Sequence, residues 1–341
     1  MTGLISGVAR LHLAQLPTPI EPMPRLTAYL GGPQLFVKRD DLTGLGLGGN
    51  KVRKLEFVLP EAEAMGADTI ICAGVTQSNT VRQVAAAAAK LGYECHCLII
   101  GDRIKPEQYR LDDEYARSGN YLLDGLFGMH PHHCSIHDNR DQKQLELADQ
   151  LRLTGKVPFV IPYGISNARG ALGYVNFVIE LASQLGNGDV PEQFDYMVHA
   201  SGSAGTQAGL VVGTNAIIPG LRIVGIDVDA DADRVHRDVV RVARATASLL
   251  GCDQTGLADL VTVLPGYAGP AYGVPTAEMV EAIRLFARLE GLVLDPVYSG
   301  KGAAGLIGLV RGGYFKPSER VLFLHTGGWP ALFSYASLFP V

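Results

Sequence analysis

Short hydrophobic segments alternate with amphipathic segments along most of the 341 residues, and this alternation restricts the fold more than any other feature. The hydrophobic segments have strand length and few polar residues, as expected for strands buried on both faces of a sheet. Strands that alternate with helices predict an α/β fold with a parallel sheet between layers of helices. Strands are predicted at 34–40, 68–74, 94–100, 157–162, 196–202, 222–228 and 320–328. Helices are predicted at 50–66, 78–92, 106–118, 140–155, 168–186, 206–218, 233–251 and 276–291.

The composition excludes several classes of protein. Hydrophobic residues make up 47% and charged residues 18% of the chain, which supplies a large core and argues against disorder. The net charge of −5 comes without a block of lysine or arginine, so no nucleic-acid partner is expected. No hydrophobic run approaches the length of a membrane span, and no membrane association is expected. Five scattered cysteines and an N-terminal segment without a signal-peptide pattern indicate a reduced, cytoplasmic protein.

Three predicted strands end at glycine-rich turns, at 73–79, 200–207 and 325–330. Parallel sheets bind ligands beyond the carboxyl ends of their strands, so these turns are candidate ligand sites. The turn ASGSAGTQ also opens a predicted helix, where free N–H groups and the helix dipole suit a phosphate. Ser203 and Thr206 add hydroxyl donors there. At this point an ordinary Gly/Ser turn explains the pattern equally well.

The stretch GLGGNKVRKLEF places Lys51 at the start of a predicted helix. A cation at this end of a helix opposes the dipole, which hints at a function. In a partly buried site the pKa of this lysine would fall, and the neutral amine could attack an aldehyde. Taken alone, Lys51 is better interpreted as a solvated surface lysine, and Lys54 as an ordinary helix-face residue. Pro60 is expected to bend or interrupt the helix.

Other polar segments have a structural and a functional interpretation. Ser78 is placed either to cap the helix that follows it or to face a ligand cleft. The segment DPVYSGKGAAG at 295–305 is predicted as a loop that carries Tyr298. The segment HPHHC at 130–134 invites a zinc-site interpretation, but its histidines stand too close together and lack a CxxC partner pair. An exposed polar loop, and no metal site, is therefore expected there.

Six segments occur in a fixed order across nearly the whole chain: GGNKVRKLEF, QSNTVRQVAA, SGSAGTQAGL, YGVP, LDPVYSGKGAAG and HTGG. Together they resemble the pyridoxal-phosphate enzymes of the D-cysteine desulfhydrase, L-cysteate sulfo-lyase and 1-aminocyclopropane-1-carboxylate (ACC) deaminase family. The resemblance implies a tryptophan synthase β-like fold, with two domains of open, twisted parallel sheets flanked by helices. It implies a large cofactor-binding domain, residues 1–51 and 162–341, into which a small α/β domain, residues 52–161, is inserted. A homodimer is also expected.

The resemblance assigns roles to individual residues. Lys51 is expected to form a Schiff base with pyridoxal phosphate, and Asn79 to bond the phenolic oxygen of the cofactor. Ser78 is expected to face the substrate, and Tyr298 and Tyr272 to be active-site tyrosines. The phosphate is expected in the loop 203–206, with backbone N–H groups of that loop as donors. The full set of expected cofactor-binding residues is Lys51, Asn50, Asn79, Ser203, Ala204, Gly205, Thr206, Ser299 and Thr326.

Departures from the family pattern bear on the reaction. ACC deaminases carry a glutamate after the tyrosine of the DPVY motif, facing the pyridine nitrogen, where this chain has Ser299. A hydroxyl leaves a weaker electron sink, which suffices for a substrate with an α-proton and a good leaving group. Ser299, the longer phosphate loop and Thr326 therefore favour the eliminating branch. Thr80 and Trp329 differ from relatives near the expected substrate side.

The expected function is a β-eliminating carbon–sulfur lyase that acts on a small cysteine-like amino acid. Lys51, as a neutral amine, would remove the α-proton, and the products would be pyruvate, ammonia and sulfide or sulfite. Tyr298 or Tyr272 would protonate a thiolate leaving group. The alternatives are an ACC deaminase, a relative that binds the cofactor without catalysis, and a nucleotide-dependent dehydrogenase, for which no clean fingerprint is present.

Overall fold

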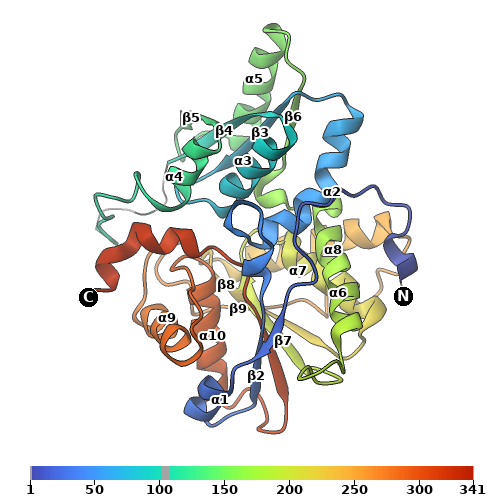
Figure 1. Cartoon of the computed structure of the whole chain (residues 1–341), viewed down its shortest axis with the longest axis vertical. Helices are drawn as coiled ribbons and strands as arrows, with labels where there is room; N and C mark the ends of the chain where they lie inside the picture. The colour runs from blue at the N-terminus through green and yellow to red at the C-terminus, as the bar shows by residue number, and fades with distance from the viewer. Residues whose placement is uncertain (1, 102–103, 105–106, 341) are drawn as a thin grey trace.

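Two open sheets with helices packed against them make up the chain (Figure 1). The computed structural model describes residues 2–101, 104 and 107–340. Within these residues the larger sheet has the strand order β1-β2-β10-β7-β8-β9, and the smaller sheet the order β5-β4-β3-β6. Neighbouring strands pair in parallel, except for β1 and β2, which pair antiparallel. The α/β class is confirmed, with one antiparallel edge strand added.

The predicted strands and most of the predicted helices are present, with ends that shift by a few residues. The larger sheet contains β1 (Ile20–Pro22), β2 (Gln34–Lys38), β7 (Tyr196–Ser201), β8 (Arg222–Asp227), β9 (Thr262–Leu264) and β10 (Arg320–Leu324). The smaller sheet contains β3 (Thr69–Gly74), β4 (Glu94–Ile100), β5 (Met129–Cys134) and β6 (Pro158–Val160). The helices are α1 (Pro24–Leu30), α2 (Asn50–Ala64), α3 (Asn79–Leu91), α4 (Gly119–Leu126), α5 (Arg140–Leu153), α6 (Ala168–Gln184), α7 (Gly205–Ile217), α8 (Ala232–Leu249), α9 (Ala277–Glu290) and α10 (Ser299–Arg311). Short 3₁₀ helices include η4 (Tyr163–Ile165) and η5 (Trp329–Leu338).

Three segments have a different secondary structure from the one expected. The helix expected at 106–118 is replaced by turns over 107–118, with residue 106 outside the described part of the chain. HPHHC is strand β5, not a loop; as an edge strand it tolerates a proline and shows no hydrophobic run. The glycine-rich segment at 295–305 turns into helix α10 from Ser299 onward. Its glycines serve packing, because a Cβ at Gly302 would lie 3.0 Å from the backbone nitrogen of Ala200 in β7.

The larger sheet has a hydrophobic core on each face. On one face, Leu322 and Leu324 of β10 pack with helices α6, α7 and α8. On the other face, Val321 and Phe323 of the same strand pack with α1, α9 and α10. This alternation explains why the strand reads as a continuous hydrophobic run, since both of its faces are removed from water.

Helix α2 runs without interruption through Pro60, so of the two expected effects of this proline an interruption is wrong. Proline lacks the N–H that would bond to the carbonyl of Glu56 one turn earlier. The backbone N–H of Leu11 takes its place and donates to that carbonyl at 2.8 Å. The side chain of Glu56 also accepts from the backbone N–H groups of Leu13 and Ala14, both at 2.8 Å. The N-terminal segment thereby supplies the hydrogen bonds that keep the helix intact at its proline.

Helix α2 connects the two halves of the molecule. Val52 and Leu55 belong to the core of the smaller sheet, whereas Phe57 belongs to a core of the larger one. A Cβ at Gly173 of α6 would lie 2.3 Å from the carbonyl oxygen of Arg53, so the two helices touch backbone to backbone. The expected division of the chain between residues 51 and 52 falls inside this helix. All strands of the smaller sheet lie between residues 69 and 160.

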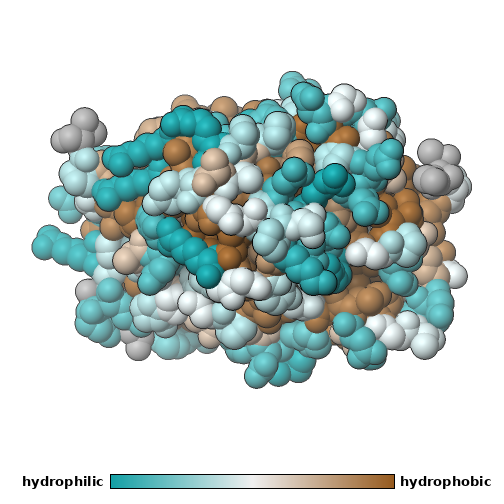
Figure 2. All heavy atoms as spheres, turned by 90° about the horizontal axis from the view of Figure 1, so that it is seen from below, coloured by the Kyte–Doolittle hydropathy of each residue, from teal (hydrophilic) through white to brown (hydrophobic). Residues whose placement is uncertain are grey.

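The molecular surface is mixed in character. Figure 2 shows the end of the molecule away from the smaller sheet, where hydrophilic residues surround scattered hydrophobic ones. Such a mixture is ordinary for a folded chain, since polar atoms cannot cover the whole surface. Within the described residues, no helix has both the length and the hydrophobicity to cross a membrane.

Candidate active site

Lys51 projects into a cavity from the first turn of α2. Two glycines with positive φ, Gly48 (71°) and Gly49 (130°), lead into this helix. A Cβ at Gly48 would lie 2.0 Å from the carbonyl oxygen of Asp41, so only glycine fits this turn. The amine of Lys51 donates to the carbonyl oxygen of Gly164 at 3.3 Å and to Oγ of Ser203 at 3.1 Å. Lys51 is only 8% exposed, so the surface-lysine interpretation is wrong.

A second lysine lies beside it. Lys54, expected to be an ordinary helix-face residue, is fully buried, and its amine donates to the same Gly164 carbonyl at 3.1 Å. Burial lowers the pKa of Lys51 to about 8. Burial and the nearby charge of Lys51 lower the pKa of Lys54 well below its usual range. The hydrogen bond with Lys54 acts in the opposite direction on Lys51 and offsets part of the effect of burial on its pKa, so a neutral Lys51 is accessible near pH 8.

Buried ion pairs of Arg53 attach α2 to the larger sheet and to α6. Arg53 is buried and donates to both carboxylate oxygens of Asp40, each at 2.8 Å, and to Glu180 of α6 at 2.8 and 3.0 Å. Burial alone would lower the pKa of Arg53, but these carboxylates outweigh it and raise that pKa. Lys38 donates to Glu180 at 2.6 Å and completes the charge balance. This buried network fixes the helix that carries Lys51 to the larger sheet.

The turn after β7 faces the two lysines. Ala204 has a φ of 68°, rare for a residue with a side chain, and it directs the chain into α7. The side chain of Ala204 makes no capping hydrogen bond, and the N–H of Gly205, the first residue of the helix, donates to Oγ of Ser166 at 3.3 Å and to the carbonyl oxygen of Ser203 at 2.8 Å. A Cβ at Gly205 would lie 2.8 Å from the amine of Lys54. Asn50 donates to Oγ1 of Thr206 at 3.0 Å and joins this turn to α2.

The side-chain amide of Asn79 is held in one orientation. Its Oδ1 accepts from Nη1 of Arg82 at 3.1 Å and from Nδ2 of Asn120 at 2.9 Å. The Nδ2 group of Asn79 therefore faces the other way, and a Cβ at Gly328 would lie 2.7 Å from it. Arg82 also donates to the carbonyl oxygen of Gly48 at 2.6 Å, which connects the Asn79 amide to the glycine turn before Lys51.

Two tyrosines and a serine provide hydroxyl groups. The hydroxyls of Tyr272 and Tyr298 are hydrogen-bonded to each other. Burial, reinforced by Tyr298, raises the pKa of Tyr272 well above its usual range, so this phenol stays protonated. Ser78 has both of its expected features: its Oγ caps α3 by accepting from the N–H of Val81 at 3.3 Å, and the residue lines the cavity.

A single cavity of about 540 Å³ brings most of the predicted residues together. Its walls include Asn50, Lys51, Ser78, Asn79, Ser203, Ala204, Thr206, Tyr272, Tyr298 and Thr326. Thr80 also lines it, whereas Trp329 packs edge to face on Phe333 with ring centroids 6.3 Å apart. Charged residues of α5 and α8, among them Arg140 and Arg234, form another part of the wall.

Ser299 has a different environment from the other predicted residues. It is buried at the start of α10 and, within the described chain, is not among the cavity-lining residues. Its hydroxyl donates to Oδ1 of Asp295 at 2.6 Å and accepts from the backbone N–H of that residue at 2.8 Å. Asp295 is fully buried, and its Oδ1 would lie 2.7 Å from a Cβ at Gly328. Sequence reasoning missed this carboxylate and the buried Lys54.

Comparison with known proteins places the chain among relatives of similar length. The sequence model of the family described as "Pyridoxal-phosphate dependent enzyme" matches residues 11–327. Proteins named D-cysteine desulfhydrase from Yersinia pestis (strain Pestoides F) and Serratia proteamaculans (strain 568) are each 44% identical over 326 residues, 96% of both chains. A solved structure titled as an ACC deaminase homologue superposes with a TM-score of 0.85 and 35% identity, covering 98% of this chain and 96% of that one. O-ureido-L-serine synthase, at 16% identity and a TM-score of 0.65, shares the fold.

Proposed function

Since this chain belongs to the pyridoxal-phosphate dependent enzymes, we propose that it is a β-eliminating carbon–sulfur lyase acting on a cysteine-like amino acid. D-cysteine would give pyruvate, ammonia and sulfide; L-cysteate would give sulfite in place of sulfide. One observation carries the proposal: the amine of Lys51 lies in a cavity that is also lined by the N-terminal turn of α7 and by Asn79, whose amide is held in one orientation. Burial in this cavity lowers the pKa of Lys51 to about 8. An amine of this kind is both a nucleophile for an aldehyde and a base for a carbon acid.

The residues present fit pyridoxal phosphate. The N-terminus of α7, the hydroxyls of Ser203 and Thr206, and the buried amine of Lys54 would hold the phosphate, whose negative charge would favour the protonated form of Lys54. The outward Nδ2 group of Asn79 would donate to the phenolic oxygen. The Lys51 amine is the group for attachment to the aldehyde. When bound, the cofactor supplies the electron sink that makes removal of an α-proton possible.

The proton transfers belong to the chain itself. As a neutral amine, Lys51 would accept the proton from the substrate Cα on its Nζ, because a pKa of about 8 leaves it partly neutral near pH 8. The paired hydroxyls of Tyr272 and Tyr298 supply a proton to the departing sulfur. The high pKa of Tyr272 keeps that proton available at neutral pH. Ser78 and the N-terminus of α3 would bind the substrate carboxylate.

Two features favour a thiol leaving group over the opening of a cyclopropane ring. The relatives named D-cysteine desulfhydrase cover 96% of this chain. In addition, the residue at the position where ACC deaminases have glutamate is Ser299, whose hydroxyl donates to the buried carboxylate of Asp295. The weaker electron sink suits a substrate that has an α-proton. Deamination of ACC is the alternative proposal, favoured only by the solved structure titled as an ACC deaminase homologue.

A substrate panel separates these reactions. The purified holoenzyme is given D-cysteine, L-cysteine, L-cysteate and ACC, and pyruvate, 2-oxobutyrate, sulfide and sulfite are measured. We expect pyruvate and sulfide from D-cysteine. Release of 2-oxobutyrate from ACC as the main activity would replace the lyase with the deaminase. Lys51→Ala is expected to lose both the visible absorption of the cofactor and the activity, and a yellow, active variant would contradict the role of Lys51.

We further propose that the protein acts as a cytoplasmic homodimer without a nucleic-acid or membrane partner. The net charge of −5 and five cysteines without a disulfide support this setting. Light scattering coupled to size exclusion tests the assembly, and a mass of twice 36.4 kDa is expected.

A further inference from the structure

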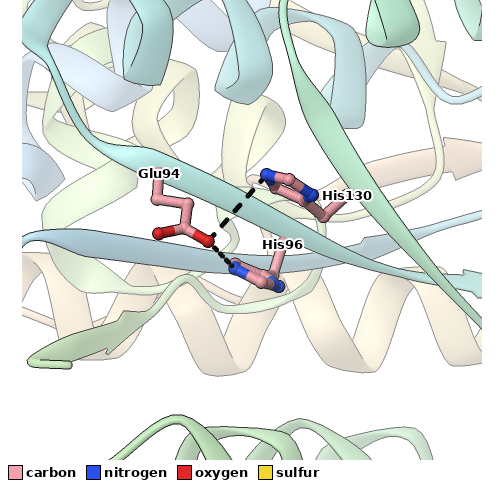
Figure 3. Close-up of side chains that lie close together, drawn as sticks. All are labelled: Glu94, His96 and His130. Carbon is pink, nitrogen blue, oxygen red and sulfur yellow. Dashed lines mark hydrogen bonds and ion pairs between the residues drawn. The ribbon is translucent and has the colours of Figure 1, made fainter. Parts of the chain in front are cut away.

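A second cluster of functional side chains lies on the smaller sheet, outside the cavity described above. Strands β4 and β5 pair in parallel, and His96 is the register partner of His130. Glu94 and His96 are two residues apart on β4, so their side chains share one face of the sheet. Figure 3 shows Glu94, His96 and His130 pointing toward one another across the two strands. Because parallel strands are aligned, the cluster lies near the amino ends of β4 and β5, whereas Ser78 of the active site follows the carboxyl end of β3.

The donor atoms have the spacing of a metal site. Oε1 of Glu94 lies 2.8 Å from Nε2 of His96 and 3.9 Å from Nε2 of His130, and the three ligand atoms all lie within 4.8 Å of one another. A tetrahedral Zn²⁺ with bonds of about 2.0–2.2 Å separates its ligand atoms by roughly 3.3–3.6 Å. Small movements of two side chains would therefore close three ligands around one ion. Two imidazoles and a carboxylate are ligands that Zn²⁺ favours.

Neighbouring residues already hold these ligands in place. Nδ1 of His96 lies 2.9 Å from Nε2 of His132, which fixes the orientation of the His96 ring and can accept its second proton. Lys156 pairs with Oε2 of Glu94, so the other oxygen, Oε1, is left facing the two histidines. Metal-binding histidines are oriented in this way by partners on their second nitrogen.

We propose that Glu94, His96 and His130 form a binding site for a borderline divalent metal ion, with Zn²⁺ as the preferred ion, that joins edge strand β5 to β4. His130 is exposed, so the fourth position is open to water. The site is structural, since it lies at the opposite end of the sheet from the active site. The segment HPHHC did not reveal this site, because two of the three ligands, Glu94 and His96, come from β4. They meet His130 only through the pairing of β4 with β5.

Titration of the chelator-treated holoenzyme with Zn²⁺, in competition with a chromogenic chelator, tests the site. We expect saturable binding of one Zn²⁺ per chain, and a higher thermal unfolding midpoint when the ion is bound. His130→Ala and Glu94→Gln should weaken binding by well over tenfold, and His132→Ala, which removes an orienting partner, by about tenfold or more. His133→Ala is the matched control: it lies on the same strand with its side chain on the opposite face, and it should bind as the unchanged protein does.

Lyase activity is measured on each variant with and without Zn²⁺, and it should be unchanged in His130→Ala. Zn²⁺ that binds elsewhere, for example at the cofactor, would give equal affinities for His130→Ala and His133→Ala. That equality, or the absence of saturable binding by the unchanged holoenzyme, would overturn the proposal. Circular dichroism of the variants distinguishes loss of the ion from loss of the fold.

Discussion

The amine of Lys51 lies 3.1 Å from the hydroxyl of Ser203, although 152 positions separate the two residues in the sequence. One belongs to the first turn of α2 and the other to the turn that opens α7. Their proximity places a nucleophilic amine next to a helix N-terminus suited to a phosphate. Each of the following predictions tests one part of the structure that maintains this arrangement.

Lys54 should contribute to cofactor affinity. In Lys54→Met the phosphate loses a buried cationic partner, so the dissociation constant for pyridoxal phosphate should rise by roughly 10- to 100-fold, as for a lost hydrogen bond to a charged group. Absorbance titration of the cofactor-free protein measures this constant. Lys90→Met, at an exposed position of α3, is the control and should leave it unchanged. Equal constants for the two variants would remove Lys54 from the phosphate site.

The orientation of Asn79 should matter more than its size. Asn79→Asp keeps the shape but replaces the Nδ2 donor with a negatively charged acceptor facing the phenolic oxygen. The visible band of the cofactor should then shift with pH differently from that of the unchanged enzyme, and kcat should fall at least about tenfold. A pH titration of the absorption spectrum checks this. An unchanged spectrum would show that the Asn79 amide does not reach the cofactor.

The Arg53 network should contribute strongly to stability. Arg53→Met leaves the buried carboxylates of Asp40 and Glu180 without their main partner and should lower the free energy of unfolding by about 3–5 kcal/mol. Urea denaturation measures the change. Arg169→Met breaks the exposed pair with Glu61, at the far end of the same helix, and should cost less than about 1 kcal/mol. Similar losses in both variants would show that burial of the network has no special effect.

The pH dependence of stability should report the buried amine. Folding lowers the pKa of Lys51 from 10.5 to about 8, so between these values the unfolded cofactor-free chain binds more protons than the folded chain. The free energy of unfolding should therefore rise with pH across this window, as far as Lys51 is concerned. Lys301 also has a pKa lowered to about 8 by burial, so the slope has more than one source. The slope should be smaller in Lys51→Met, and an identical slope would contradict a lowered pKa.

The sequence was sufficient to predict the layer architecture, because continuous hydrophobic strands and capped amphipathic helices are local signals. Glycine-rich turns after parallel strands were also expected to meet at one edge of a sheet, and residues of the turns at 73–79 and 200–207 line one cavity. The roles of single residues, Lys51 among them, came only from the family resemblance and stay predictions. The sequence did not reveal Lys54, whose burial depends on the contact between α2 and the turn at Gly164. Similarly, α10 was predicted as a loop, because glycines selected for close helix–sheet packing look the same in sequence as glycines of a turn. The backbone N–H of Leu11 donates to the Glu56 carbonyl that Pro60 leaves without a donor, and this long-range contact has no local sequence pattern.

Lys51 and Lys54 are both buried lysines that could form the Schiff base with pyridoxal phosphate, and we propose that Lys51 forms it. Both amines donate to the carbonyl of Gly164, but Lys51 lines the cavity, whereas the amine of Lys54 lies against Gly205 at the start of α7. Reduction of the holoenzyme with borohydride, followed by tryptic digestion and mass spectrometry, tests this directly, because trypsin cleaves at Arg53 between the two lysines. A pyridoxyl group on the peptide that ends at Arg53 and contains Lys51 is the predicted result. A pyridoxyl group on Lys54, or none on either lysine, would contradict it.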